Sequence, residues 1–270
     1  MNMTPGGRSW AVCVVSAAFA ATVSCMRTSD VPEAVKSELA SGGTLRAAIN
    51  LANSILVAQG GSDAGLGGIA PDVARELARR LDVPVRFVPY PSAAAAADDA
   101  GSGTWDVAFI GSDPAREDAV AFTAPYVELQ STYLVPAGSR LTSIADVDTA
   151  GVRIAARPRT AYDLVLRRTL KNALLVYPAD TETDIDLVRS GKADALAGLR
   201  QVLEQTSTSV PGSRVLDGEF AAIQQAIGVP RGRAAAATYL DGFVADIKAS
   251  GWLARAIEER GARGVAVAPE

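Results

Sequence analysis

Arg116 lies where a small anion could be held. It follows a short apolar run, residues 107–110, whose length and flanking residues predict a buried strand. The turn between them contains Ser112 and Asp113, and Pro114 then opens a helical turn. Open α/β sheets bind small anions at such points, beside the free backbone amides of a helix start. A guanidinium there can hold a carboxylate through two parallel hydrogen bonds, although an arginine on a solvated helical turn is the alternative.

The composition excludes several classes of chemistry. The chain contains no histidine, which rules out Ser-His-Asp and Cys-His catalysis and His-ligated zinc. Its formal net charge is −4 and it has no block of Lys and Arg, so nucleic acid is not expected as a partner. With 270 residues, 49% of them hydrophobic, it can bury the core of one large domain or two lobes. These features favour a binding protein over an enzyme, and we expect no metal and no cofactor.

The N-terminus has the pattern of an export signal. Arg8 supplies the positive charge, and residues 10–23 form an uncharged apolar run too short to span a membrane. We therefore predict a signal peptide over residues 1–24 and a tether over residues 25–43. The residues before Cys25 resemble a lipoprotein cleavage box, which makes Cys25 a candidate for lipidation. At most one cysteine survives cleavage, so no intramolecular disulfide is possible.

Beyond the predicted tether, strand and helix patterns alternate along the chain, and the alternation begins a second time after residues 136–138. This alternation predicts α/β lobes with mainly parallel sheets and helices on both faces. The predicted strands are 44–50, 83–88, 105–110, 127–135, 152–156, 173–177, 193–197 and 223–229, with a further one at Val215. The predicted helices are 71–81, 92–100, 161–170, 181–190, 199–206, 234–249 and 252–260.

The second start of the pattern predicts two lobes. Chain crossings between them are expected near residues 134–138 and 226–232. Lobe one would then comprise residues 44–135 and 230–262, lobe two residues 136–229, and a tail residues 263–270.

A glycine-rich run at residues 65–70 matches the dinucleotide fingerprint G-x-G-x-x-A. That fingerprint needs a strand directly before the glycines and an acidic residue at the end of the next strand. Here the preceding predicted strand ends at residue 50, well before the glycines. The next predicted strand leads into Pro89 and Tyr90, which are not acidic. The run therefore predicts a hairpin-like loop.

The segment around Arg116 resembles bacterial periplasmic solute-binding proteins of the polar-amino-acid type, family 3. In that family an acidic residue, a strand, a Ser/Thr-rich turn, an Arg and an F-S/T-x-P-Y string recur in this order. Here they are Asp106, the strand, Ser112, Arg116 and the residues 122–126. The resemblance covers roughly residues 43–262. It implies a two-lobed type II periplasmic-binding-protein fold and a periplasmic, monomeric component of an ABC importer. A permease in the inner membrane would be its partner, and a small carboxylate-bearing solute its ligand.

The resemblance also implies roles for the polar residues at helix starts. Ser112 and Arg116 would hold the carboxylate of the solute from lobe one, and Thr160 would hold it from lobe two. The alternative role for Ser112 and Thr160 is helix capping, which is common for these residue types. Asp113, which shares the capping alternative, would pair with Arg116 or meet an amine.

The run at residues 191–200 is similar to the G-x-x-D-A strand of the family, with one departure. Many amino-acid binders place an Asp at the end of this strand to take the α-ammonium, and Leu199 stands there in this chain. Without that anion, Arg200 could meet a second anionic group, and an organic acid becomes an alternative to an amino acid. Asp194 is expected at the sheet edge. Arg157 and Arg159 add positive charge near the other lobe-two contacts, unless both are simply solvated.

Other polar residues are expected to face the cleft. Asn50, Asn53 and Tyr90 end strands or loops there, and their amide and aromatic groups would orient the solute. Gln224 and Gln225 begin the return crossing, where polar residues line the cleft or bond across it.

Two alternative functions remain open at the level of sequence. Cyclohexadienyl-type dehydratases use the same fold to act on cyclic carboxylates, and Asp113 would be the acid in such an enzyme. A sensory ectodomain is the third reading.

Overall fold

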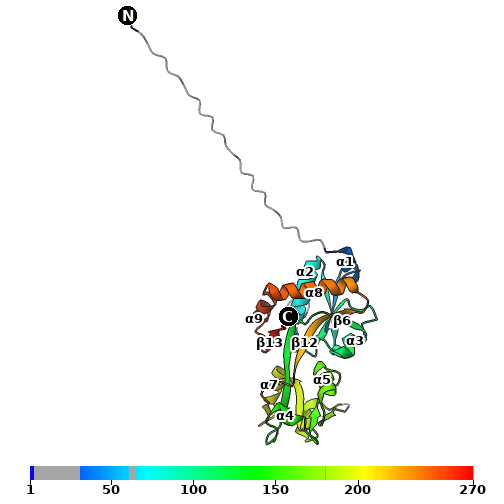
Figure 1. Cartoon of the computed structure of the whole chain (residues 1–270), viewed down its shortest axis with the longest axis vertical. Helices are drawn as coiled ribbons and strands as arrows, with labels where there is room; N and C mark the ends of the chain where they lie inside the picture. The colour runs from blue at the N-terminus through cyan, green and yellow to red at the C-terminus, as the bar shows by residue number, and fades with distance from the viewer. Residues whose placement is uncertain (3–30, 61–64, 180, 270) are drawn as a thin grey trace. The chain divides into compact units, whose positions relative to one another are not determined.

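In lobe one, helices pack on a sheet whose strands β1, β4 and β5 are parallel (Figure 1). The computed structural model describes residues 1–2, 31–60, 65–179 and 181–269. The elements that open this lobe are α1 (Glu33–Leu39), β1 (Leu45–Asn50), β2 (Ala58–Gln59), β3 (Leu66–Gly67), α2 (Ile69–Leu81), β4 (Val85–Tyr90), α3 (Ala93–Asp98), β5 (Val107–Gly111), the 3-10 helix η1 (Pro114–Arg116) and β6 (Val120–Phe122). Strand β1 pairs in parallel with β4 on one side and β5 on the other.

Lobe two repeats this plan. Its elements are α4 (Ile144–Val147), β8 (Arg153–Ala155), α5 (Ala161–Thr169), β9 (Leu174–Val176), α6 (Asp184–Arg189), β10 (Ala195–Leu199), α7 (Arg200–Ser207) and β11 (Arg214–Val215). Strand β8 pairs in parallel with β9 and β10, so it holds the central place that β1 holds in lobe one. The predicted alternation of strand and helix is therefore present in both lobes.

Two long strands, β7 (Val127–Val135) and β12 (Ala221–Pro230), run through both lobes and join them into one mixed sheet. Within the described residues the strand order is β4-β1-β5-β12-β7-β10-β8-β9. Strand β12 pairs with β7 from Ala221 to Gln225 and with β5 and β6 beyond that point, while β7 pairs with β10 from Ser131 onward. The crossings predicted near residues 134–138 and 226–232 fall at the end of β7 and in the second half of β12. Extended strands, rather than loops, carry the chain between the lobes.

The chain ends by returning to lobe one, as predicted. Helices α8 (Ala234–Ala249) and α9 (Trp252–Glu259) follow β12. Leu240 and Val244 of α8 and Leu253 of α9 belong to the same buried cluster as Ile49 of β1 and Leu77 of α2. Residues from both ends of the folded region therefore share one buried cluster, and Figure 1 shows α8 beside α1 and α2.

The segments predicted as a tether and a tail both contain regular secondary structure. Residues 33–39 of the predicted tether form α1, whose Val35 and Leu39 are buried, and Glu38 accepts a hydrogen bond from the backbone of Ala236 at 2.8 Å. Residues 265–267 of the predicted tail form β13 (Val265–Val267), which pairs antiparallel with β7. Both segments are too short to show a periodic pattern, and distant parts of the chain stabilise them.

Helix α2 explains the glycine-rich run that precedes it. Val73, Leu77 and Leu81 are fully buried, and their spacing of four places them on one face of the helix. Gly68 has a φ of 103°, and a Cβ there would lie 2.4 Å from the carbonyl oxygen of Leu56. Only glycine allows both the backbone conformation and this close approach. The predicted hairpin is also confirmed, because β2 pairs antiparallel with β3.

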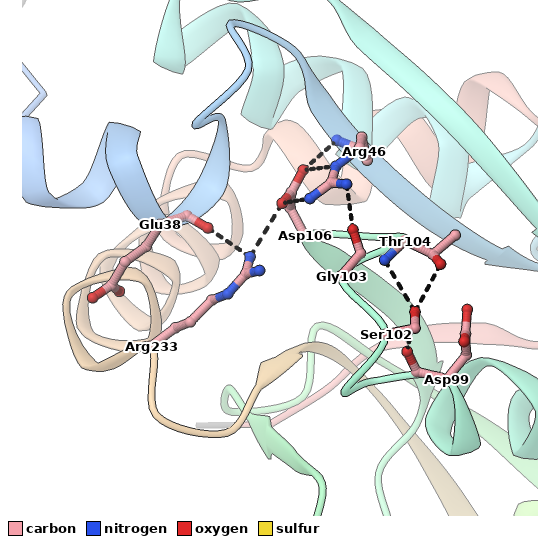
Figure 2. Close-up of polar contacts among 8 residues, drawn as sticks. All are labelled: Glu38, Arg46, Asp99, Ser102, Gly103, Thr104, Asp106 and Arg233. Atoms are coloured by element: carbon pink, nitrogen blue, oxygen red, sulfur yellow. Dashed lines mark hydrogen bonds and ion pairs between the residues drawn. The ribbon is translucent and has the colours of Figure 1, made fainter.

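Asp106 joins three elements of lobe one (Figure 2). Its carboxylate accepts hydrogen bonds from the backbone nitrogen, Nε and Nη2 of Arg46, at 2.9, 2.8 and 2.6 Å. Arg233, directly before α8, donates to the same carboxylate at 3.1 Å and to the carbonyl oxygen of Glu38 in α1 at 2.6 Å. The Asp106 side chain is only 2% exposed, so these donors compensate a buried charge.

Asp194 and Arg153 form the same contact in lobe two. The backbone nitrogen, Nε and Nη2 of Arg153 donate to Asp194 at 2.8, 3.0 and 2.8 Å. Asp194 stands just before β10, as Asp106 stands just before β5. The hydrogen bonds from Arg153 lower the pKa of the Asp194 carboxyl. This side chain is part of the sheet edge, as expected.

Candidate functional site

A cavity of about 420 Å³ lies where loops of the two lobes meet. Lobe one contributes residues after β1, the start of α3 and the end of β5. Lobe two contributes the loop from β8 to α5, the start of α6, the end of β10 and part of α7, and β12 adds Ile223 and Gln225. The parallel strands β1 and β5 therefore present their carboxyl ends to the cavity, which is where α/β sheets bind ligands.

Asn50, Asn53 and Thr160 of the predicted binding set line this cavity, and so does Gln225 of the return crossing. The amide Oδ1 of Asn50 accepts from the backbone of Ala52 at 3.1 Å, which leaves its amide nitrogen as a donor. Asn53 is buried, and its Nδ2 lies 3.5 Å from Oε1 of Gln225. Both asparagines are thus held in place by their own loop and by the return strand.

Thr160 is the residue before α5 and also caps that helix. Its Oγ1 accepts from the backbone of Asp163 at 3.3 Å and donates to the carbonyl oxygen of Arg157 at 2.9 Å. The capping alternative and the cavity position therefore both hold. Because Oγ1 is already engaged, the backbone amides at the start of α5 are the donors that Thr160 positions near the cavity.

Arg116, which was predicted to hold the solute carboxylate, lies outside the set of lining residues. It is 6% exposed, and its guanidinium donates to two carbonyl oxygens, that of Gly111 and that of Arg159 at 3.0 Å. Burial lowers the pKa of this guanidinium, and the nearby charge of Asp113 partly opposes that effect. Since Gly111 belongs to lobe one and Arg159 to lobe two, Arg116 links the lobes.

Ser112 and Asp113 also lie off the cavity wall. Ser112 donates from its backbone nitrogen to the carbonyl oxygen of Gln224 at 2.9 Å. Asp113 caps η1 through the backbone of Ala115 at 2.9 Å, and its carboxylate accepts from Nη1 of Arg168 at 2.7 and 2.9 Å. The charged group that donates to Asp113 in the structure is therefore Arg168 of lobe two.

Tyr90, Arg200 and Gln224 complete the set of predicted residues that do not line the cavity. Tyr90 donates to the carboxylate of Asp99, and burial together with that contact raises the pKa of its phenol to about 12. Arg200 donates to Oε1 of Gln130 at 3.0 Å and to backbone carbonyls of the segment after β11. Nε2 of Gln224 donates to Glu128 of β7 at 3.0 Å. Other protein groups therefore engage all three side chains.

Arg157, which was expected to add positive charge near the lobe-two contacts, lines the cavity together with Tyr162 and Asp184. Nη2 of Arg157 lies 3.8 Å from Oδ2 of Asp184, and the Asp184 side chain is 17% exposed. Burial raises the pKa of the Tyr162 phenol; the charge of Asp184 adds to this effect, and that of Arg157 opposes it. Sequence reasoning missed Asp184 because the predicted helix began at residue 181. The signal was the capping box of Thr183 and Asp186, which sets the helix start at Asp184.

Contacts across the two lobes surround the cavity. Arg159, in the loop before α5, pairs with Asp98 of α3 through Nη1 at 2.9 Å and Nη2 at 2.6 Å. The hydrogen bonds from Arg159 lower the pKa of the Asp98 carboxyl. Gly111 of β5 also lies against Ala161 of α5, since a Cβ at Gly111 would be 2.9 Å from that of Ala161. These contacts hold the loops of the two lobes against each other.

The family model for bacterial extracellular solute-binding proteins, family 3, matches residues 56–260. The chain belongs to this family. The two-lobed fold agrees with this membership. Because the family is extracellular, the protein acts outside the cytoplasm. A search of curated proteins finds no match to the chain.

Solved structures of similar fold include the following three. An amino acid ABC transporter substrate-binding protein, AbpA from Streptococcus pneumoniae bound to L-arginine, is 21% identical and has a TM-score of 0.66, over 84% of this chain and 97% of that one. A mutant of ArgBP from T. maritima is 20% identical with a TM-score of 0.66, over 84% and 98% of the two chains. The ancestral amino acid-binding protein AncCDT-1, a precursor of cyclohexadienyl dehydratase, is 20% identical with a TM-score of 0.66, over 83% and 97%. At these identities the likeness concerns the fold.

The predictions for the N-terminus fall on residues that are not described. Residues 3–24 of the predicted signal peptide and Cys25 all lie outside the described residues. Among the helices of the described residues, none combines the length and the apolar character needed to cross a membrane.

Proposed function

We propose that this family 3 protein is the periplasmic solute-binding component of an ABC importer and captures a small carboxylate-bearing solute. The observation that carries the proposal is the cavity of about 420 Å³ walled by loops from both lobes. A solute that touches both walls stabilises the closed form, because it makes the full set of contacts only there. A membrane permease would recognise the closed form.

The carboxylate of the solute is placed at the start of α5 in this proposal. Arg157 supplies a cation, and the first backbone amides of α5, positioned by the Thr160 cap, supply donors. Asn50 and Asn53 approach from lobe one and orient the solute by their amides. Arg116 would contribute indirectly, by holding the carbonyl oxygens of Gly111 and Arg159 together.

A thermal-shift screen of the full chain, refolded to remove bound solute, tests the proposal. The panel holds amino acids, their keto and hydroxy analogues, and dicarboxylates. A ligand at about 100 times its Kd adds about 2.7 kcal/mol to stability, which raises the melting temperature of a chain this size by several degrees. A panel without any shift, confirmed by calorimetry, would refute a carboxylate-binding role.

The proposal extends to export and partners. Cleavage after residue 24, acylation of Cys25 and a monomeric state remain predictions. Intact mass and cell fractionation of the native protein and of Cys25→Ser test the first two, because the variant should move from the membrane to the soluble fraction. Light scattering tests the third.

The dehydratase alternative depended on Asp113 as the acid. In the structure Asp113 lies off the cavity wall and its carboxylate is bonded to Arg168. We therefore expect no product from prephenate or arogenate when either is incubated with the protein. Product formation that Asp113→Asn abolishes would establish the enzyme instead.

A further inference from the structure

Few charged side chains line the cavity, and they differ in whether another protein group already binds them. Three of them line it: Arg157, Arg159 and Asp184. Arg159 is engaged in two hydrogen bonds with Asp98. Asp184 is thus the one acidic side chain among the lining residues, all of which belong to the described part of the chain.

Asp184 has room for a further partner. Its Oδ1 accepts a hydrogen bond from the backbone of Ile185 at 3.1 Å. Arg157, its neighbour of opposite charge, lies 3.8 Å away, which is beyond hydrogen-bond distance. A small solute that carries both an ammonium and a carboxylate could pair with Asp184 and Arg157 at shorter distances than Asp184 and Arg157 pair with each other.

Much of the wall formed by lobe two and β12 is hydrocarbon. Six apolar side chains from α6, β10, α7 and β12 line it: Ile185, Leu196, Leu199, Val202, Leu203 and Ile223. Leu196, Leu203 and Ile223 are buried. Leu199 is also the position at which the sequence resemblance expects an acidic residue. A charged solute side chain against this wall would lose its hydration without gaining a partner.

We propose that the solute is a zwitterionic amino acid with a hydrocarbon side chain, and that Asp184 takes its ammonium group. This inference rests on the proposed function and on the carboxylate position at the start of α5. It separates this protein from the relative described as bound to L-arginine. Arginine carries two positive groups, and the cavity offers a single carboxylate beside two arginines.

Calorimetric titration of the solute-free full chain tests this inference with three ligands: L-leucine, L-arginine and 4-methyl-2-oxopentanoate, the amine-free analogue of leucine. We expect L-leucine to bind at least about 30-fold more tightly than L-arginine, as for a buried charge left without a partner. Asp184→Asn should weaken L-leucine by about 30-fold or more and change the affinity for the keto acid less than about threefold.

Two further variants complete the design. Asp217→Asn is the matched control, because Asp217 is exposed and lies outside the cavity lining; it should change neither affinity. Leu199→Asp adds a second carboxylate to the wall and should shift the ratio of L-arginine to L-leucine affinity at least tenfold toward arginine.

The outcomes distinguish a failure of this inference from a failure of the proposed function. Tighter binding of L-arginine than of L-leucine, or an equal loss of both leucine and keto acid in Asp184→Asn, would overturn the inference and leave a carboxylate-binding protein. Binding of amine-free acids alone would do the same. A failure of every amino acid and organic acid to bind would refute the proposed function itself.

Discussion

The carboxylate of Asp113 in lobe one and the guanidinium of Arg168 in lobe two meet across the lobes at 2.7 Å. Asp113 comes directly before η1, and Arg168 lies in the last turn of α5. The Asp113 side chain is 2% exposed and that of Arg168 is 45% exposed, so the contact buries the acid and leaves the base at its edge. A separation of the lobes would expose Asp113 to water and break the pair. The contact therefore favours the closed arrangement.

Arg168→Met should shift the solute-free protein toward an open arrangement. The variant leaves the Asp113 carboxylate buried with only the backbone of Ala115 as a donor, and opening relieves that penalty. Because Arg168 is half exposed, the effect should fall between those of exposed and buried pairs, at about 1–2 kcal/mol. Small-angle X-ray scattering would show a larger radius of gyration.

Arg167→Met is the matched control for that variant. Arg167 is the preceding residue of α5, but its partner Asp163 is in the same lobe, at 3.1 Å. Its loss should leave the radius of gyration unchanged. An equal expansion in both variants would show that the helix, and not the contact across the lobes, controls closure.

Arg116→Gln should lower solute affinity by about tenfold or more through the same closed arrangement. The wild-type guanidinium donates to Gly111 and Arg159, and a hydrogen bond from a charged donor is worth about 1.5–3 kcal/mol. If Arg116 acts through closure, scattering of the solute-free variant will also report expansion. A loss of affinity without expansion would instead support the direct carboxylate contact expected from sequence.

The sequence predicts the elements better than the contacts among them. The strand at 127–135 and the helix at 234–249 were predicted with their observed bounds, because long apolar patterns with clear ends define both. The strand β13 was missed, since its three residues gain stability only by pairing with β7. The local sequence pattern therefore predicts where an element begins and ends, whereas pairing between distant segments decides which short strands form.

The candidate site shows the same limit. Asn50, Asn53 and Thr160 follow strands or precede a helix, and their place in the chain brings them to the cavity. Arg116 was expected there for the same reason. In the structure its guanidinium donates to backbone carbonyls, one of which, that of Arg159 at 3.0 Å, belongs to a lobe-two loop that the local sequence around Arg116 does not reveal.

Gly111→Ala should impede closure by a steric effect. A Cβ at this position would lie 2.9 Å from Cβ of Ala161 and 3.3 Å from Nε2 of Gln225, and the first contact is between lobes. We expect weaker solute binding and a larger radius of gyration. Gly101→Ala is the control, since a Cβ there meets nothing within 4 Å. Ala161→Gly should restore closure in the double variant, and a failure to do so would place the cause elsewhere.

The Asp98–Arg159 pair predicts a pH dependence of closure. The hydrogen bonds from Arg159 lower the pKa of Asp98 in the closed arrangement. A carboxyl with a lowered pKa stabilises that arrangement above its ordinary pKa of about 3.9, and the contribution is lost as pH falls through the lowered value. Both side chains are 57% exposed, so the effect should stay below about 1 kcal/mol.

Scattering or distance measurements between labelled lobes, made from pH 7 down to acid, would follow this loss. Asp98→Asn removes the titrating group and should flatten the part of the curve that Asp98 contributes. An unchanged curve in the variant would assign the pH dependence to other carboxyls.

The two matched aspartates of the lobes, Asp106 and Asp194, allow burial to be tested at nearly constant geometry. Each accepts three hydrogen bonds from one arginine on the neighbouring strand, with all distances between 2.6 and 3.0 Å. Their side chains differ in exposure, 2% for Asp106 and 37% for Asp194. Asp106 also receives Arg233 (Figure 2).

Asp106→Asn should therefore destabilise the protein far more than Asp194→Asn. In the first variant Arg46 and Arg233 lose a buried counter-charge, which costs about 3 kcal/mol or more. In the second, water replaces much of the lost contact and the cost should be about 1 kcal/mol or less. Urea unfolding measures the free energy of unfolding of each variant, and the two values are comparable if the m-values are the same. Equal losses would mean that the hydrogen-bond geometry, and not the exclusion of water, sets the strength of this contact.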